Sequence, residues 1–192
     1  MSEVELDVLD LKEMILSNNS FGPADVGAIR AAISENYGHF GELRDAVHEM
    51  EDDEAISPAG TTKMGVCQFL LGRFKDSQQT LQTADGSAMA LFYQARCCFE
   101  LGSYQDSIET YGKAKTSGYN EDQCNIGIAE SHRYAGRIDE ALAILDNIFG
   151  PAEQTADYMY QRAATVAAVG GRMDEALALY QRAVQTDENH AG

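Results

Sequence analysis

The sequence predicts an all-α fold, a solenoid of about five helix–turn–helix units. A glycine recurs in the same local context, with successive spacings of 34, 30, 34 and 35 residues. Each of these glycines is followed four residues later by an acidic residue and preceded seven residues earlier by a small one. The recurring glycines are Gly38, Gly72, Gly102, Gly136 and Gly171.

The segment after each glycine is predicted to be a helix. A carboxylate in a first helical turn lies near free backbone N–H groups and the positive end of the helix dipole, so the repeated acid marks a helix start. Large side chains nine residues after the glycine and apolar ones twelve after fall on one helical stripe. The acids are Glu42, Asp76, Asp106, Glu140 and Glu175.

The segment before each glycine is predicted to be a helix that packs closely against another. A position that stays small in five separate segments is one that a neighbouring helix backbone approaches, and the glycine suits the left-handed conformation that ends many helices. The small residues are Ala31, Gly65, Ala95, Ala129 and Ala164.

This pattern resembles the tetratricopeptide repeat, most clearly in residues 136–145 and 171–180. The resemblance implies a right-handed helical-repeat solenoid, and the glycines place its repeats at 24–57, 58–87, 88–121, 122–156 and 157–190. The chain departs from the family pattern in having no Trp and in holding Glu188 at the last closing-proline position. Repeat 58–87 is shorter by about one helical turn.

Residues 1–23 are predicted to form an acidic amphipathic helix and a linker ahead of the repeats. Ser2 and Glu5 are spaced like a capping box. The helix would cap the first repeat, or alternatively serve as a dimerisation helix. Its apolar face comprises Val4, Leu6, Leu9, Leu11, Met14, Ile15 and Leu16.

The net charge of −17 is concentrated at the two ends of the chain. Residues 1–57 carry 14 acids and 3 bases, a balance of −11, whereas residues 58–121 carry 6 of each and residues 122–192 carry 11 and 5. This charge argues against nucleic acid as a partner. The acidic run 49–54 could attract a basic partner or be a solvated loop. With no membrane-spanning run and no secretory leader, the sequence predicts a cytoplasmic protein.

No catalytic or metal-binding constellation is evident, so we expect no enzyme activity, no cofactor and no metal. No two of the four histidines share a helix face with a carboxylate at ligand spacing. Ser131 and His132 are adjacent and would point about 100° apart on a helix. Cys67, Cys97, Cys98 and Cys124 lack C-x-x-C spacing and are interpreted as buried thiols.

The resemblance implies that the first helix of each repeat lines a concave groove, and three arginines of this acidic chain fall on those helices. Aromatic and arginine clusters are favoured in interfaces. Alternatively, Arg96 stacks on neighbouring phenylalanines, Glu130 pairs with Arg133, and some of the aromatic residues belong to the core. The candidate partner-binding residues are Phe69, Phe92, Arg96, Phe99, Arg133, Tyr134, Tyr158 and Arg162.

Two functions follow from this interpretation. The first is a non-enzymatic scaffold whose groove binds a protein segment with acidic and apolar side chains. The second is a structural solenoid that self-associates through its terminal helices into a homo-oligomer. Leu177, Tyr180 and Val184 leave the last helix more apolar than a terminal repeat requires, so either the natural chain continues past Gly192 or this end packs against another chain. Family members that clamp a chaperone tail use a lysine–asparagine pair in the groove that no copy has here.

Overall fold

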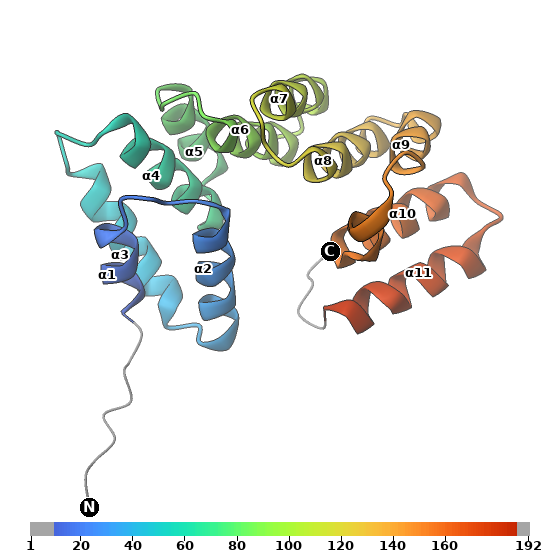
Figure 1. Cartoon of the computed structure of the whole chain (residues 1–192), viewed down its shortest axis with the longest axis horizontal. Helices are drawn as coiled ribbons and strands as arrows, with labels where there is room; N and C mark the ends of the chain where they lie inside the picture. The colour runs from blue at the N-terminus through green and yellow to red at the C-terminus, as the bar shows by residue number, and fades with distance from the viewer. Residues whose placement is uncertain (1–9, 188–192) are drawn as a thin grey trace, which may run out of the picture. The chain divides into compact units, whose positions relative to one another are not determined.

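The computed structural model describes residues 10–187, and within that range every regular element is helical. The prediction of an all-α helical-repeat fold is therefore confirmed (Figure 1). The elements are α1 (Leu11–Ser17), α2 (Pro23–Glu35), α3 (His39–Glu51), α4 (Pro58–Leu70), α5 (Phe74–Gln82), α6 (Ala88–Glu100), α7 (Tyr104–Thr116), α8 (Glu121–Tyr134), α9 (Ile138–Leu145), the 3-10 turn η1 (Gly150–Gln154), α10 (Ala156–Val169) and α11 (Met173–Thr186).

The chain forms two compact units, residues 1–85 with α1 to α5 and residues 86–192 with α6 to α11. Within each unit, helices that follow one another across a glycine turn pack together as pairs, as α4 does with α5 and α6 with α7. In the second unit each pair also packs on the next, since α7 contacts α8 and α9 contacts α10.

Four of the five predicted glycine turns have the expected left-handed conformation. Gly72, Gly102, Gly136 and Gly171 have φ values of 74°, 79°, 76° and 71°. After Gly72, the N–H of Arg73 donates to the carbonyl of Gln68 at 3.0 Å, which satisfies a carbonyl at the end of α4. The same bond recurs after Gly102 and Gly136.

The first turn differs from the prediction. Gly38 has φ −60°, an ordinary right-handed value, and its N–H donates to the Asn36 side chain at 2.9 Å. Because helix α2 ends in extended backbone at Asn36, the register shifts by one residue: Ala32 is buried and Ala31, the predicted contact residue, is exposed. The prediction for Ala31 is wrong, and Ala32 takes its place.

The close helix approach predicted at the small positions is confirmed in α4 and α6. The hydroxyl of Ser77 donates to the carbonyl of Gly65 at 2.7 Å, and Ser107 donates to the carbonyl of Ala95 at 2.9 Å. A Cβ atom on Gly65 would lie 2.6 Å from Leu81 Cγ. The small residues five positions after the glycine thus contact those seven positions before it.

Helix α1 packs on α3 within the first unit (Figure 1). Asp10 caps its first turn, and Leu11 and Ile15 are buried among side chains of α2, α3 and α4. The buried ammonium of Lys63 donates to the carbonyls of Ile15 and Asn18 at 2.8 and 2.9 Å and so closes the C-terminal end of α1. The predicted capping box of Ser2 and Glu5, with Val4, Leu6 and Leu9, lies outside the described residues. The roles of cap or dimerisation helix stay predictions.

All four cysteines are buried free thiols. Burial raises the pKa of Cys67 to about 12 and that of Cys124 to about 11, so both are protonated at neutral pH. Residues 10–187 hold no cluster of three metal-ligating side chains. None of the helices in this range is long and apolar enough to cross a bilayer.

Candidate binding surface

The candidate residues of the second unit lie on its three first helices. Arg96 and Phe99 belong to α6, Arg133 and Tyr134 to α8, and Arg162 to α10. Helix α8 contacts both α6 and α10, so these three helices form one continuous layer. The remaining candidate outside this layer is Phe69, on α4 of the first unit.

Three of the eight candidates are buried in the fold and expose little area to a partner. Phe69 and Phe92 are 8% exposed and Tyr158 is 7% exposed. Phe92 stacks on Tyr119, with ring centroids 4.1 Å apart and an interplanar angle of 15°. Tyr119 follows the end of α7, and its ring covers the face that Phe92 would otherwise offer.

An aromatic cluster joins α6, α7 and α8. The rings of Phe99 and Tyr134 meet edge to face at 5.0 Å, and Tyr104 lies 5.7 and 5.8 Å from them. Tyr134 is 53% exposed, so a large part of its ring faces solvent. The guanidinium carbon of Arg133 lies 4.5 Å from the Tyr134 ring centroid, a cation–π contact.

A polar network joins α8 to α10 beside this cluster. The Gln161 amide donates to Glu130 Oε1 at 2.7 Å, and Arg133 Nη2 donates to Gln161 Oε1 at 3.0 Å. Glu130 and Arg133 also form an ion pair at 3.8 Å, and burial raises the pKa of Glu130 above its ordinary value. The Nε atom of Arg133 is buried and has no hydrogen-bond partner in the structure.

Arg96 adds a second guanidinium to the same surface. Burial acts to lower its pKa, but Tyr111 and, more weakly, Glu130 raise it above the ordinary value. Glu100, an exposed residue at the end of α6, acts in the same direction. The two arginines are therefore balanced by nearby carboxylates, and the local charge is close to zero in a strongly acidic chain.

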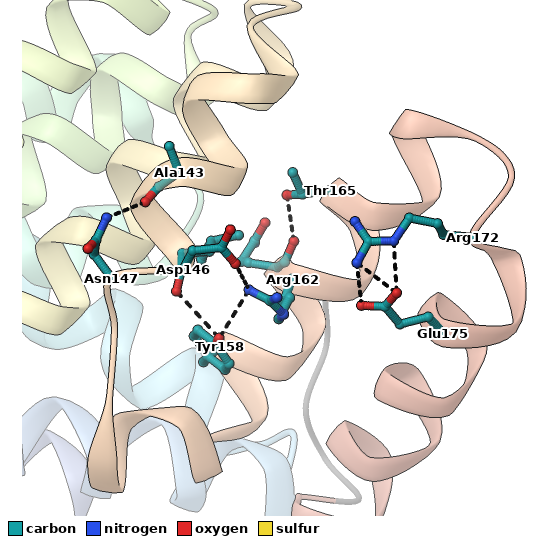
Figure 2. A network of polar contacts seen from close by, with 10 residues as sticks. Ala143, Asp146, Asn147, Tyr158, Arg162, Thr165, Arg172 and Glu175 are labelled. Atoms are coloured by element: carbon teal, nitrogen blue, oxygen red, sulfur yellow. Dashed lines mark hydrogen bonds and ion pairs between the residues drawn. The ribbon is translucent and has the colours of Figure 1, made fainter.

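Arg162 is held by groups on either side of the connection from α9 to α10. Figure 2 shows its guanidinium lying between Asp146 and Tyr158: Nη1 donates to Asp146 Oδ1 at 2.6 Å and to the Tyr158 hydroxyl at 3.4 Å. That hydroxyl in turn donates to the carbonyl of Leu145, and burial raises its pKa. Arg162 is thus paired mainly with groups that join α10 to the end of α9.

Sequence reasoning did not select Tyr104 or Asp146 for this surface. Tyr104 completes the aromatic cluster, and Asp146 neutralises Arg162. Tyr104 could have been found, since it is the bulky residue two positions after Gly102 and α7 packs on α8. Asp146 gives no such signal, because its contact depends on the path of the 3-10 turn.

Stacked helical pairs with glycine turns, and a layer of first helices carrying an aromatic and arginine surface, define a helical-repeat protein. A search with family models identifies the repeat: the tetratricopeptide repeat model matches residues 69–120 and 126–191. This chain belongs to the tetratricopeptide repeat family. No curated protein sequence matches it.

Solved structures of the same fold cover nearly the whole chain. TTC0263, a thermophilic protein of this repeat class from Thermus thermophilus, has a TM-score of 0.65 and 15% identity over 93% of this chain and 92% of its own. A crystal structure of MamA gives 0.60 and 16%, over 88% and 96%. YrrB, described as having an unusual peptide-binding site, gives 0.57 and 16%, over 86% and 95%. At these identities the likeness concerns the fold.

Proposed function

We propose that this chain is a non-enzymatic interaction scaffold that binds a protein segment on the α6, α8 and α10 layer of its second unit. Tetratricopeptide repeats generally mediate protein–protein interactions. The bound segment carries acidic and apolar side chains. We also propose a cytoplasmic location, which suits four reduced thiols.

The observation that carries the proposal is the exposure of Tyr134 on a rigid aromatic support. Its ring is held by Phe99 and Tyr104, yet 53% of the residue faces solvent. A preordered aromatic side chain loses little conformational entropy on binding, and such residues dominate many interfaces. An apolar side chain of the partner would cover this ring.

Arg133 supports the acidic part of the proposal. Its guanidinium lies beside the Tyr134 ring, and 16% of its side chain is exposed. A partner carboxylate that reaches this exposed part would form an ion pair with a guanidinium already held by Gln161. Because the local charge is balanced, a carboxylate is repelled less here than by the acidic first 57 residues.

Selection from a displayed peptide library with the full chain as bait tests this proposal. We expect enriched peptides to combine carboxylates with aliphatic or aromatic residues. Tyr134→Ala should weaken a selected peptide by about tenfold or more, and Arg133→Gln by a smaller factor, since Gln keeps a hydrogen-bonding group. We prefer Gln to Glu, because an acid here would face buried Glu130.

Two controls separate surface binding from general damage. Arg44→Gln removes an exposed arginine of the first unit, and should leave peptide affinity unchanged. Circular dichroism of each variant should show unchanged helicity. Undiminished affinity of Tyr134→Ala for every selected peptide would place binding elsewhere on the molecule.

A further inference from the structure

The last helix, α11, carries an exposed apolar stripe. Met173, Leu177 and Val184 are 63%, 55% and 58% exposed, and half-buried Tyr180 lies between them. Their spacing of four, three and four residues places all four side chains on one helix face. These residues, called the α11 stripe below, border the buried side of the helix marked by Ala176 and Ala183.

The equivalent stripe inside the second unit is a helix-packing surface. At the same distances from its turn glycine, α7 carries Tyr104, Ile108, Tyr111 and Lys115. Three of these contact α8: Tyr104 meets the Tyr134 ring, Tyr111 packs against Gly127, and Lys115 donates to Asn125 at 3.2 Å. In this fold the stripe on the second helix of a pair is thus the surface on which the first helix of the next pair packs.

The face of α8 that packs on the α7 stripe has a counterpart on α2. Buried Ala32 in α2 corresponds to buried Ala129 in α8, which places Arg30, Ser34 and Tyr37 at the positions of Gly127, Ser131 and Tyr134. The predicted glycine register aligns Ala31 with Ala129 and would have missed this correspondence.

The two faces share two features. In α8 the Ser131 hydroxyl donates to the carbonyl four residues earlier at 2.8 Å, and Ser34 does the same in α2 at 3.0 Å. Both faces end in an exposed tyrosine, Tyr134 in α8 and Tyr37 at 86% exposure after α2. Arg30 and Ser34 are exposed as well, so this face of α2 has the form of a first helix without a preceding stripe.

We propose that the α11 stripe of one copy binds the Arg30, Ser34 and Tyr37 face of a second copy, continuing the helical stack from chain to chain. The equivalence places Met173 near Tyr37, just past the end of α2, where a sulfur–aromatic contact can form. Because Arg30 has a side chain where α8 has Gly127, Tyr180 lies farther out than Tyr111 does and meets the Arg30 guanidinium with its ring. The contact joins two different surfaces, so it builds open chains or rings. Because each copy carries a charge of −17, association strengthens as salt is added.

Two substitutions block one end each. Leu177→Glu places a charge in the α11 stripe, and Ser34→Glu places one at the centre of the α2 face; both positions are exposed, so the fold should tolerate the change. The matched controls are Ala178→Glu, an exposed position on another side of α11, and Ala59→Glu, an exposed position at the start of α4 in the first unit.

Sedimentation velocity of the full chain over a range of concentrations tests the proposal. The unsubstituted chain and both controls should grow in mass with concentration, and Leu177→Glu and Ser34→Glu should each remain monomeric. Mixing these two should yield a mixed dimer and nothing larger, since one intact pair of faces remains; native mass spectrometry with one variant labelled with nitrogen-15 identifies it.

Three results would overturn the proposal. The unsubstituted chain could stay monomeric at every concentration and salt level. Ser34→Glu could still associate, which would indicate pairing of two α11 stripes. The mixture of end-blocked variants could fail to form the mixed dimer although the unsubstituted chain associates.

Discussion

Substituting Gly65 by Ala should destabilise the first unit, although Ala is the better helix former. The added methyl would lie 2.6 and 2.7 Å from two carbon atoms of Leu81 and 3.4 Å from Thr80 Cγ2. Leu81 is 1% exposed and cannot swing outward. Overpacking costs about 1–3 kcal/mol, and the gain in helix propensity offsets about 1 kcal/mol of that. Moving the helices apart would also lengthen the 2.7 Å bond from Ser77 to the Gly65 carbonyl.

We therefore expect Gly65→Ala to lower the free energy of unfolding by about 1–2 kcal/mol. Urea titration followed by circular dichroism at low protein concentration measures it. Gly27→Ala is the matched control, because a Cβ there meets nothing within 4 Å in helix α2 of the same unit. The control should gain up to about 1 kcal/mol. A Gly65→Ala chain as stable as the Gly27→Ala chain would refute the close-packing argument.

Three further changes test separate features. Gly136→Val should cost about 1 kcal/mol or more in thermal unfolding, because its φ of 76° disfavours a branched side chain. Gly38→Ala should cost less, because its φ is −60° and its Cβ would meet only the exposed Asn36 side chain, at 3.1 Å. Lys63→Met should destabilise the first unit by about 1–3 kcal/mol by leaving carbonyls of α1 unpaired, and hydrogen exchange in α1 that stays as slow as in the parent would contradict this. Burial raises the pKa of Glu130 above 4.5, so the folded state binds this proton more tightly than the unfolded state does. The resulting stabilisation is present at low pH and is lost as the pH rises through the pKa of Glu130 in the folded chain. Stability of Glu130→Gln relative to the parent should therefore improve as pH increases from about 4.5, and a constant difference across pH would contradict it.

The helical pairs and their contacts could be predicted because they depend on local rules repeated five times. A glycine that ends one helix and an acid that begins the next need only neighbouring residues, which is why Gly72 and Asp76 have the predicted roles. The pairing of Gly65 with Ser77 follows from the same spacing. The turn at Gly38 was predicted wrongly because α2 ends in extended backbone at Asn36 and not at a left-handed glycine.

The candidate surface was predictable only in outline. Position on a first helix indicates that Tyr134 is exposed, as it is in the structure, but does not reveal what covers Phe92. That depends on Tyr119, which lies beyond the end of α7 and folds back over the ring. Likewise Arg162 meets Asp146 only because helix α9 stops at Leu145 and a 3-10 turn precedes α10. Such contacts are set by connections between helices, which periodicity does not describe.

Backbone amide NMR of the full isotope-labelled chain, titrated with a selected peptide, tests the binding surface most directly. We expect the largest shift changes at the C-terminal ends of α6 and α8, around Phe99, Arg133 and Tyr134. At peptide concentrations that saturate the parent chain, the Tyr134→Ala chain should remain far from saturated. Changes confined to the first unit or to α11, with α6 and α8 unaffected, would contradict the account.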